Sequence, residues 1–358
     1  KPATNPYGEN RKFAQAAEEI LSRTRISEGY CLDLGCGDGA LAYELAKRTR
    51  LHIYSVEPNA AKAEDARKKL DAAGLYGVRV TVHQRPLDAT RYPKYFANLI
   101  VSSESVTHDA GAVDLTEVRR LQRPYGGTLC VGVRGAMQID VRGSLDGAGS
   151  WTHQYANAAN TTCSTDQVAG PLRPLWYRQI EQRMPNRHGR GPAPLFLEGR
   201  VFSLGMNSLV AIDAYNGCVL WEYPVPGILQ PLQSGSWMGT SGTHGPYCVS
   251  ETGIYLRRDD YCLRIDQVSG KLLGKFAAPE GPDAKPGIWG FIARDGDLLF
   301  GTLANTEHVV NNAYSHRIYN NRWHKGLDKR LTESTTLFAI DAVTGKLRWR
   351  YDAIDSIR

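Results

Sequence analysis

YCLDLGCGDGALAYELAKRT, residues 30–49, is the stretch that decides the fold of the first part of this chain. Its apolar start predicts a short β-strand, and the residues from Ala40 onward follow the pattern of a helix. Between them stand Gly35, Gly37 and Gly39, whose missing Cβ atoms let the backbone turn sharply and approach a ligand. A strand, a glycine-rich turn and a helix predict the ligand-holding corner of a doubly wound (Rossmann-like) α/β sheet.

Strands and helices alternate beyond this corner. Further strands are predicted at 51–57, 77–84, 97–103 and 126–133, and helices at 60–69 and 114–124. Asn59 can cap the first of these helices, and Gly74 can end it with a positive φ. We expect Val78, Val80 and Val82 on one face of their strand. The alternation predicts a parallel sheet with its ligand above the carboxyl ends of the strands.

The glycine turn alone does not decide which class of ligand is bound. With Ala40 it fits the dinucleotide pattern GxGxxA, and Glu57 stands near the expected distance for a carboxylate that binds ribose hydroxyls. Asp33 and Asp88 add acidic residues, which suit a positive sulfonium and ammonium better than a pyrophosphate. The combination favours S-adenosylmethionine over a dinucleotide.

With these residues, the segment 15–133 resembles the class I S-adenosylmethionine-dependent methyltransferases. The resemblance implies that Asp33 lies near the ammonium of the cofactor, that Glu57 holds the ribose hydroxyls and that Asp88 accepts from the adenine amino group. The full set of cofactor-binding residues that it implies is Asp33, Gly35, Cys36, Gly37, Asp38, Gly39, Glu57, Pro58, Asp88 and Ser102.

The segment also departs from that family. The chain has SSES after the fourth predicted strand, where members acting on nitrogen often carry Asp-Pro-Pro-Tyr, and Asn98 and Leu87 replace a common acidic residue and a common glycine. After Val133 the chain does not supply the last two strands of the family. The candidate bases near strand ends are His83, Glu104, His108 and Asp109. A dedicated base is optional for a good nucleophile, so the catalytic residues stay unassigned.

The second half of the chain contains a repeat. LVAIDAYNGCVLWEY (209–223) and LFAIDAVTGKLRWRY (337–351) share the spacing of Asp, Gly and Trp, whereas YCLRIDQVSGKLLGKF (261–276) has Gly274 at the tryptophan position. Each copy predicts a strand, a turn and a strand, in which the Asp bonds turn amides and the Gly takes a positive φ. The longer spacing before the last copy predicts an insertion within 305–335.

Short-stranded repeats of this kind are typical of β-propeller blades. The segment from Trp151 to the end resembles the pyrroloquinoline-quinone-type propellers with tryptophan-docking repeats, which predicts domains at 1–145 and 151–358 and about four blades. The propeller looks incomplete in this chain, so we expect either further blades beyond Arg358 or self-association of copies. The resemblance does not favour bound quinone, because many such propellers bind none. Arg187, His188 and Arg190 form a cationic loop that suits an anionic ligand or is a solvated connection.

Composition limits the remaining classes. The 358 residues carry a net charge of +6 without a long block of one sign, so a nucleic-acid partner is not favoured. Seven cysteines without a CxxC spacing indicate neither a zinc ribbon nor covalent haem, and we expect Cys31 and Cys130 to be buried. No apolar run is long enough to predict a membrane span. The first residue is Lys1, and a secretory signal could have been removed before it. The propeller resemblance favours an extracytoplasmic (periplasmic) location, with the cytoplasm as the alternative.

Three functions follow from these features. The first is methyl transfer from S-adenosylmethionine to an unidentified small-molecule or protein acceptor, with a propeller that binds substrate or partner. The second is a catalytically silent binding or assembly protein. The third is a quinoprotein-type oxidoreductase, which ranks last because the sequence shows no vicinal cysteine pair and no recognisable metal cluster.

Overall fold

The computed structural model describes residues 5–108, 113–167, 174–178, 192–228, 245–258, 260–281, 284–285, 287–303 and 334–357. Asp109, the loop with Arg187, His188 and Arg190, and nearly all of the expected insertion at 305–335 lie outside these ranges. The chain divides into two compact units. The first, here the α/β unit, is Lys1–Asp146 with Leu172–Tyr177, and the second, here the blade unit, is Gly147–Pro171 with Arg178–Arg358. The sequence-based bounds assign Leu172–Tyr177 to the other domain.

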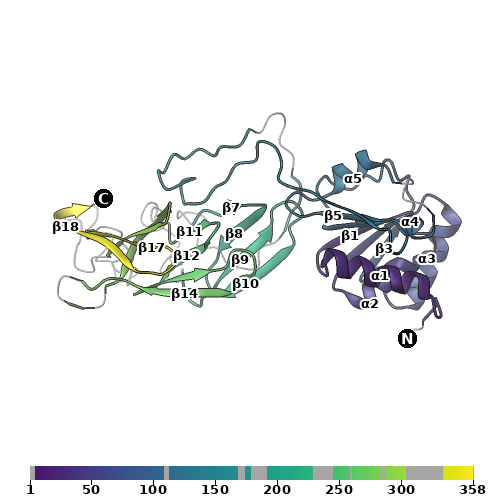
Figure 1. Ribbon diagram of the computed structural model, residues 1–358, viewed down its shortest axis with the longest axis horizontal. Coiled ribbons are helices and arrows are strands. Elements are labelled where there is room, and N and C mark those ends of the chain that lie inside the picture. Colours follow the sequence, from purple (N-terminus) through teal and green to yellow (C-terminus); the bar gives the residue numbers. More distant parts are fainter. Residues whose placement is uncertain are drawn as a thin grey trace, which may run out of the picture. The chain divides into compact units, whose positions relative to one another are not determined.

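The α/β unit is a six-stranded sheet with helices on both faces (Figure 1). Its elements are α1 (Arg11–Thr24), β1 (Tyr30–Leu34), α2 (Ala40–Arg48), β2 (His52–Val56), α3 (Ala60–Ala72), β3 (Val80–His83), β4 (Leu99–Val101), α4 (Ser103–Thr107), α5 (Leu115–Leu121), β5 (Thr128–Val131) and β6 (Gln138–Val141). The strand order is β3-β2-β1-β4-β5-β6, and the pairs are parallel except for β5 with β6. The expected doubly wound fold is confirmed.

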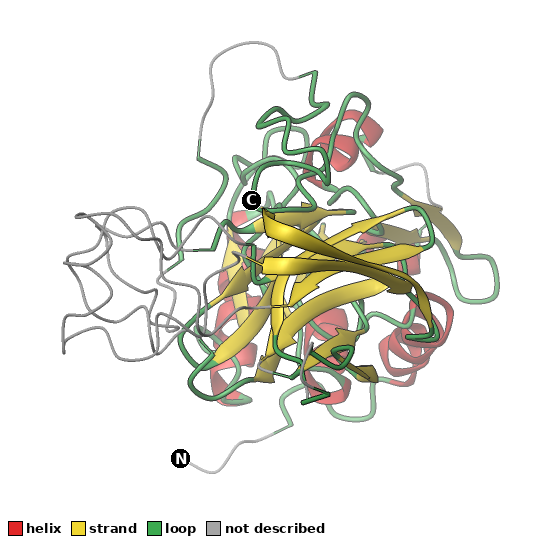
Figure 2. Cartoon of the chain, turned by 90° about the vertical axis from the view of Figure 1, so that its left-hand side faces the viewer, coloured by secondary structure: helices red, strands yellow, loops and turns green. Residues whose placement is uncertain are grey.

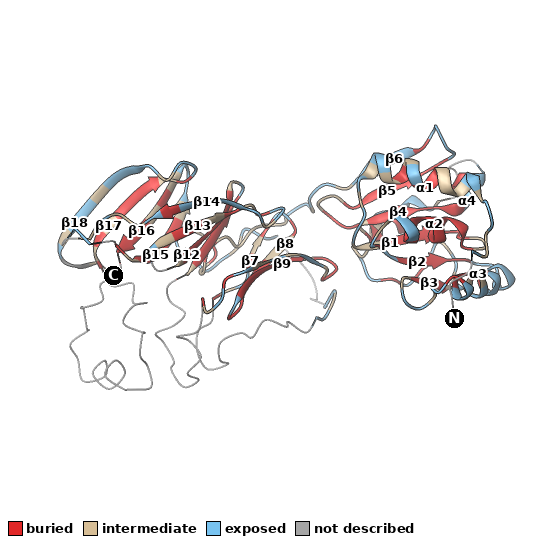
Figure 3. Ribbon diagram, turned by 90° about the horizontal axis from the view of Figure 1, so that it is seen from below, coloured by how far each residue is buried: buried red, intermediate tan, exposed pale blue. Residues whose placement is uncertain are grey.

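Alternate residues of the central strands serve two cores. Cys31 faces a core that α1, α2 and α3 share, together with Cys130 of β5. Leu32 faces the opposite core, which α5 closes with Val118 and Leu121. Figure 3 shows these strands buried and the outer faces of the helices exposed. Burial of both cysteine thiols agrees with their apolar sequence context.

Two expectations for this unit are corrected. Val78 is 69% exposed, because the chain turns at this point, with the Val80 amide donating to the Leu75 carbonyl at 3.0 Å, and the strand begins only at Val80. The chain also forms one more strand after Val133 than the sequence predicts. This strand, β6, is exposed at all four positions and pairs antiparallel to β5.

The blade unit consists, in its described residues, of three four-stranded antiparallel sheets (Figure 2). The first contains β7 (Leu195–Leu197), β8 (Arg200–Leu204), β9 (Ser208–Asp213) and β10 (Val219–Pro224). The second contains β11 (Tyr247–Ser250), β12 (Gly253–Arg258), β13 (Tyr261–Ile265) and β14 (Leu272–Ala277). The third contains β15 (Trp289–Asp295), β16 (Leu298–Leu303), β17 (Ser334–Asp341) and β18 (Leu347–Ile357).

These sheets are propeller blades that pack face to face. One core lies between the first and second sheets, and another lies between the second and third. Three blades are fewer than the four to eight of a closed propeller, so the described residues form an incomplete one. The expected number of about four blades stays a prediction.

Each sequence repeat is the outer hairpin of one blade. In all three, the glycine amide donates to the carbonyl of the repeat's aspartate at 2.8–2.9 Å, and the glycine has a φ of 71° to 74°. The aspartate side chain accepts from turn amides, as Asp341 does from Thr344 at 2.8 Å. The turn chemistry expected from the sequence is therefore confirmed.

An aromatic ring of one blade covers the turn glycine of the next. A Cβ atom on Gly270 would lie 2.6 Å from the ring of Trp221, whose Nε1 donates to the Gln267 carbonyl at 3.2 Å. A Cβ atom on Gly345 would lie 2.5 Å from the ring of Phe276. The second blade therefore replaces the missing tryptophan at Gly274 with a phenylalanine two residues further along β14.

Candidate functional site

The glycine turn between β1 and α2 rests on the end of β2. The Gly35 and Cys36 amides both donate to the Val56 carbonyl, at 2.9 and 3.0 Å. Gly35, Gly37 and Gly39 have φ values of 68°, 56° and 84°, a region that side chains with a Cβ atom rarely adopt. The sequence therefore needs glycine at these three positions for backbone reasons alone.

The three glycines differ in what lies beside them. A Cβ atom on Gly35 would lie 2.8 Å from Oε2 of Glu104, and one on Gly39 would lie 3.1 Å from the Tyr7 hydroxyl. A Cβ atom on Gly37 would meet nothing within 4 Å. Gly37 thus leaves open space at the centre of the turn.

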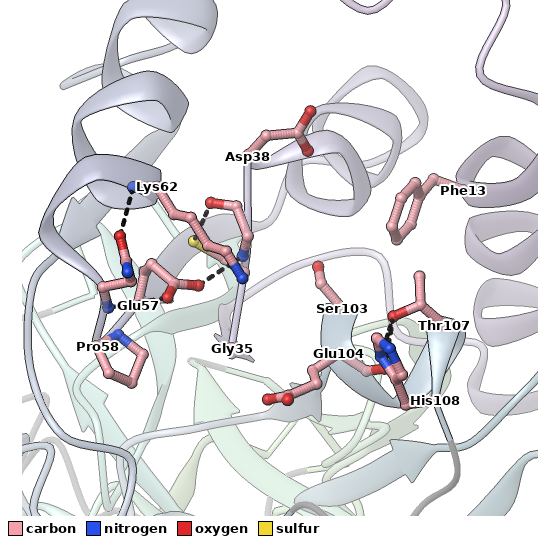
Figure 4. A pocket seen from close by; sticks show the side chains of 13 residues that line it. Phe13, Gly35, Asp38, Glu57, Pro58, Lys62, Ser103, Glu104, Thr107 and His108 are labelled. Carbon is pink, nitrogen blue, oxygen red and sulfur yellow. Dashed lines mark hydrogen bonds between the residues drawn. The ribbon is translucent and has the colours of Figure 1, made fainter.

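This space belongs to a cavity of about 300 Å³ above the carboxyl ends of β1, β2 and β4 (Figure 4). The cavity is bounded by the glycine turn, the start of α3, the short helix α4 and one ring from α1. Its lining residues are Phe13, Gly35, Cys36, Gly37, Asp38, Glu57, Pro58, Asn59, Lys62, Ser103, Glu104, Thr107 and His108. A cavity at the carboxyl ends of the strands is where the sequence predicts the ligand of this fold.

Glu57 joins two walls of the cavity. Its Oε2 accepts from the Gly37 amide at 2.8 Å, and its Oε1 accepts from the Asn59 amide at 3.0 Å. Asn59 in turn caps α3 by accepting from the Lys62 amide at 3.1 Å. Each carboxylate oxygen retains acceptor capacity beyond these bonds. The carboxylate is therefore fixed in place and can still accept hydroxyl donors from a ligand.

Asp33 lies beneath the cavity and does not line it. Its carboxylate is fully buried, and its two oxygens accept from the Ser103 amide and the Ser103 hydroxyl, each at 2.8 Å. Burial raises the pKa of Asp33 to about 7, although the bonds from Ser103 act in the opposite direction. Asp33 ties β1 to the start of α4.

Asp38 and Cys36 line the cavity at the turn itself. Asp38 Oδ1 accepts from the Ala40 amide at 3.2 Å, and its Oδ2 pairs with Lys69 Nζ at 2.9 Å. The Tyr7 hydroxyl donates to the Asp38 carbonyl at 2.9 Å. Burial raises the pKa of the Cys36 thiol above its usual range, so the thiol stays protonated. These contacts hold the turn rather than offer a nucleophile.

Gly39, Asp88 and Ser102 are not among the lining residues. Gly39 is the N-cap of α2, and Ser102 is buried and caps α4 by accepting from the Ser105 amide at 3.2 Å. Asp88 is exposed in the loop after β3. Their roles toward a cofactor stay predictions.

The candidate bases differ in whether they line the cavity. Glu104 and His108 line the cavity, whereas His83 does not and instead contacts the Tyr92 hydroxyl through Nδ1 at 2.6 Å. Burial lowers the pKa of His83, with Arg85 and Arg67 acting in the same direction. His108 Nδ1 lies 2.8 Å from the Thr107 hydroxyl, which orients its ring. Asp109 is outside the described residues.

Sequence reasoning missed five lining residues, Phe13, Asn59, Lys62, Ser103 and Thr107, of which Asn59 was expected only as a helix cap. Lys62 follows the helix cap Asn59 by three residues and Ser103 follows β4 directly, so their positions in the fold are a usable signal. Phe13 lies far back in the chain, and nothing in its local pattern marks it. Figure 4 shows Phe13 on the same side of the cavity as Thr107 and His108.

The charges of the lining favour a cationic ligand. Glu57 and Glu104 contribute carboxylates, Lys62 contributes an ammonium group, and the carboxylate of Asp38 is already paired with Lys69. The turn adds bare backbone, and Phe13 adds an apolar ring. Such a cavity suits a molecule with hydroxyl groups and a positive charge, held close to the glycine backbone.

Residues 31–126 match the family model described as "Methyltransferase domain". The α/β unit carries a methyltransferase-type domain. This match covers β1 through α5 of the unit and includes every residue of the glycine turn. No curated protein matches the chain.

Solved structures similar to this chain include two methyltransferases. A putative S-adenosyl-L-methionine-dependent methyltransferase from Methanococcus maripaludis is 30% identical, over 34% of this chain and 56% of its own, with a TM-score of 0.32. A putative sarcosine dimethylglycine methyltransferase from Galdieria sulphuraria is 19% identical, over 34% and 45%, with a TM-score of 0.29. The chain thus spans about half the length of these two proteins.

A third similar structure covers a larger share of this chain. It is a quinohemoprotein alcohol dehydrogenase from Pseudomonas putida, 14% identical over 57% of this chain and 26% of its own, with a TM-score of 0.37.

The described residues contain no group of three or more His, Cys, Asp or Glu side chains arranged to hold a metal ion. In the same residues, no helix has the length and apolarity needed to cross a membrane.

Proposed function

We propose that the methyltransferase-type domain binds S-adenosylmethionine in the cavity above the glycine turn and transfers its methyl group to an acceptor. The observation that carries this proposal is the open space beside Gly37. This space belongs to a cavity of about 300 Å³ that Glu57 also lines. A bare backbone beside a fixed carboxylate fits a ribose with a short linear group attached. The acidic lining favours the positive charge of a sulfonium over a pyrophosphate.

The residues that would hold the cofactor are those of the turn and of the β2 end. Glu57 would accept the two ribose hydroxyls, because both of its oxygens keep free acceptor positions. Pro58 lines the cavity beside it. Asp88, exposed in the loop after β3, would accept from the adenine amino group.

S-adenosylmethionine supplies a methyl group on a positive sulfur, which leaves as a neutral thioether when an acceptor lone pair forms the new bond to carbon. The far end of α4, with Thr107 and His108, is the part of the lining that the proposed cofactor contacts of Gly37 and Glu57 leave to an acceptor. There His108 Nε2 can take up the proton that the acceptor releases, since Nδ1 faces Thr107. Placement of the acceptor supplies most of the rate in such a reaction.

For the blade unit we propose the tryptophan-docking type of propeller and a role in binding the substrate or a partner. The packing of Trp221 on Gly270 and of Phe276 on Gly345 supports the type.

Calorimetry with S-adenosylhomocysteine tests cofactor binding. We expect micromolar binding by the wild-type chain and loss of binding in Gly37→Leu, whose side chain would enter the cavity. Gly77→Leu is the matched control, because Gly77 also has a positive φ and nothing within 4 Å but lies in the exposed turn before β3. Absence of binding at millimolar concentration would reject the proposal, and binding of NAD instead would support the dinucleotide interpretation.

A transfer assay with labelled S-adenosylmethionine and mixed acceptor pools tests turnover. We expect label in an acceptor with the wild-type chain and Gly77→Leu, and none with Gly37→Leu. Cofactor binding without any transfer would support the silent binding or assembly protein instead.

A further inference from the structure

Two carboxylates lie near Gly35, and they differ in what they can still bind. Asp33 is fully buried, and Ser103 engages both of its oxygens. Glu104 is exposed and lines the cavity. Its carboxylate makes no hydrogen bond or ion pair with any residue in the described part of the chain. Of these two carboxylates, Glu104 is therefore the one that a ligand can reach.

Glu104 also lies directly over the glycine turn. Its Oε2 is 2.8 Å and its Cβ 3.1 Å from the position that a Cβ atom on Gly35 would take. Figure 4 shows the side chain reaching from α4 toward Gly35. Any larger residue at position 35 would displace this carboxylate, so the bare turn makes room for Glu104 as well as for a ligand.

We propose that Glu104, and not Asp33, binds the ammonium group of the cofactor's amino-acid part. This inference rests on the proposed function and assigns the acid that the family resemblance places at Asp33. An ammonium donates up to three hydrogen bonds, and a carboxylate open to the cavity can accept them directly. Asp33 is then a positioning residue, which holds Ser103 and with it the start of α4 from which Glu104 projects.

The test compares two ligands that differ only in the amino-acid part. S-adenosylhomocysteine has the ammonium group, and 5′-methylthioadenosine keeps the adenine, the ribose and the sulfur but has no ammonium group. Calorimetry measures both with the wild-type chain and with Glu104→Gln, which keeps the shape and removes the charge. We expect the affinity for S-adenosylhomocysteine to fall roughly tenfold or more, and that for 5′-methylthioadenosine to stay within about twofold.

Two further variants make the result specific. Glu64→Gln removes one carboxylate from the exposed surface of α3, outside the cavity, and should leave both affinities unchanged. Asp33→Asn should change both affinities by a similar factor, because Asp33 acts through the position of α4.

The outcomes separate this inference from the proposed function. Equal affinities of Glu104→Gln and wild type for S-adenosylhomocysteine would overturn the inference and leave cofactor binding intact. An equal loss for both ligands would also overturn it, since it would indicate a structural effect. If only Asp33→Asn lost affinity selectively for S-adenosylhomocysteine, the result would indicate that Asp33 binds the ammonium group. If the wild-type chain binds neither ligand, the proposed function fails and the inference fails with it.

Discussion

The glycine turn of the α/β unit and the glycine turns of the blades use the same backbone for opposite purposes. Gly37, Gly270 and Gly345 all have a positive φ, between 56° and 73°. Beside Gly37 there is open space, whereas an aromatic ring fills the space beside Gly270 and Gly345. A glycine in this conformation thus indicates a tight turn, and its surroundings decide whether the turn receives a ligand or a neighbouring blade.

The largest effect should come from removing a ring that covers a glycine. Phe276 is 8% exposed and packs on Gly345, so Phe276→Ala should lower the free energy of unfolding of the blade unit by about 4 kcal/mol. Leu272→Ala is the control on the same strand, with 49% exposure and an expected cost below about 0.5 kcal/mol. Urea unfolding followed by hydrogen exchange in β14 and β17 measures both. Similar costs would show that the ring does not join the blades.

The next effect comes from adding a methyl group on the glycine side of the contact. Gly345→Ala combines an unfavourable positive φ with displacement of the Phe276 ring, at a total cost of about 3 kcal/mol. Gly37→Ala carries only the backbone cost, about 1 to 2 kcal/mol, because its surroundings are empty. The same hydrogen-exchange measurement compares them. An equal cost at both positions would contradict the distinction between a filled and an open turn.

The two units should also respond oppositely to acid. Burial raises the pKa of Asp33 to about 7, so the folded α/β unit holds a proton there that the unfolded chain releases above about pH 4. The stabilising contribution is complete below pH 4 and is lost as the pH rises through 7. Relative to Asp33→Asn, the wild-type unit should lose a few kcal/mol of stability between pH 4 and 8. Denaturation curves at several pH values measure the difference, and a constant difference would contradict a raised pKa.

His153 should give the reverse trend in the blade unit. Its Nε2 accepts from the Arg294 amide at 3.1 Å, and burial lowers its pKa to about 4. A lowered histidine pKa stabilises the fold above the unfolded value near 6.5, and this contribution is lost as the pH falls toward 4. Relative to His153→Gln, the wild-type blade unit should lose up to a few kcal/mol of stability between pH 7 and 4. A pH-independent difference, measured by hydrogen exchange in β15, would show that His153 does not titrate in the fold.

The smallest effect is expected at Trp349, the tryptophan of the last repeat. It corresponds to Trp221 in sequence, but it is 38% exposed, and its described ring contact is with Phe300 at 6.0 Å. Trp349→Ala should therefore cost about 1 kcal/mol, well below Phe276→Ala. A cost as large as that of Phe276→Ala would mean that Trp349 makes contacts equivalent to a ring on a glycine.

Local patterns predicted most of the two architectures. The glycine turn, the cap at Asn59 and the hairpin repeats depend on residues within a few positions of one another, which the sequence displays directly. Strand β6 escaped prediction because its alternation of polar and apolar residues, Gln-Ile-Asp-Val, is only four residues long, and all four are exposed. The role of Phe276 escaped because its partner Gly345 belongs to another blade.

In the candidate site, local sequence patterns identify some residues and miss those that depend on contacts between distant parts of the chain. Gly37 and Glu57 could be named because a glycine turn and a strand end mark them. The hydrogen bonds that occupy Asp33 could not be foreseen, because their donor is Ser103, seventy residues later in the chain. The same holds for Phe13, which reaches the cavity only through the packing of α1.

The exchange of tryptophan for phenylalanine in the second blade has a consequence for protein engineering. Each contact between blades consists of a ring from one blade and a turn glycine from the next. A blade grafted from this chain into another propeller would bring the ring of one contact and the glycine of the other. The donor ring reaches its glycine from β14 position 276 instead of 274, so a recipient blade aligned by its tryptophan would be offset by two residues along that strand. A chimera designed around ring and glycine as one transferable pair avoids that mismatch.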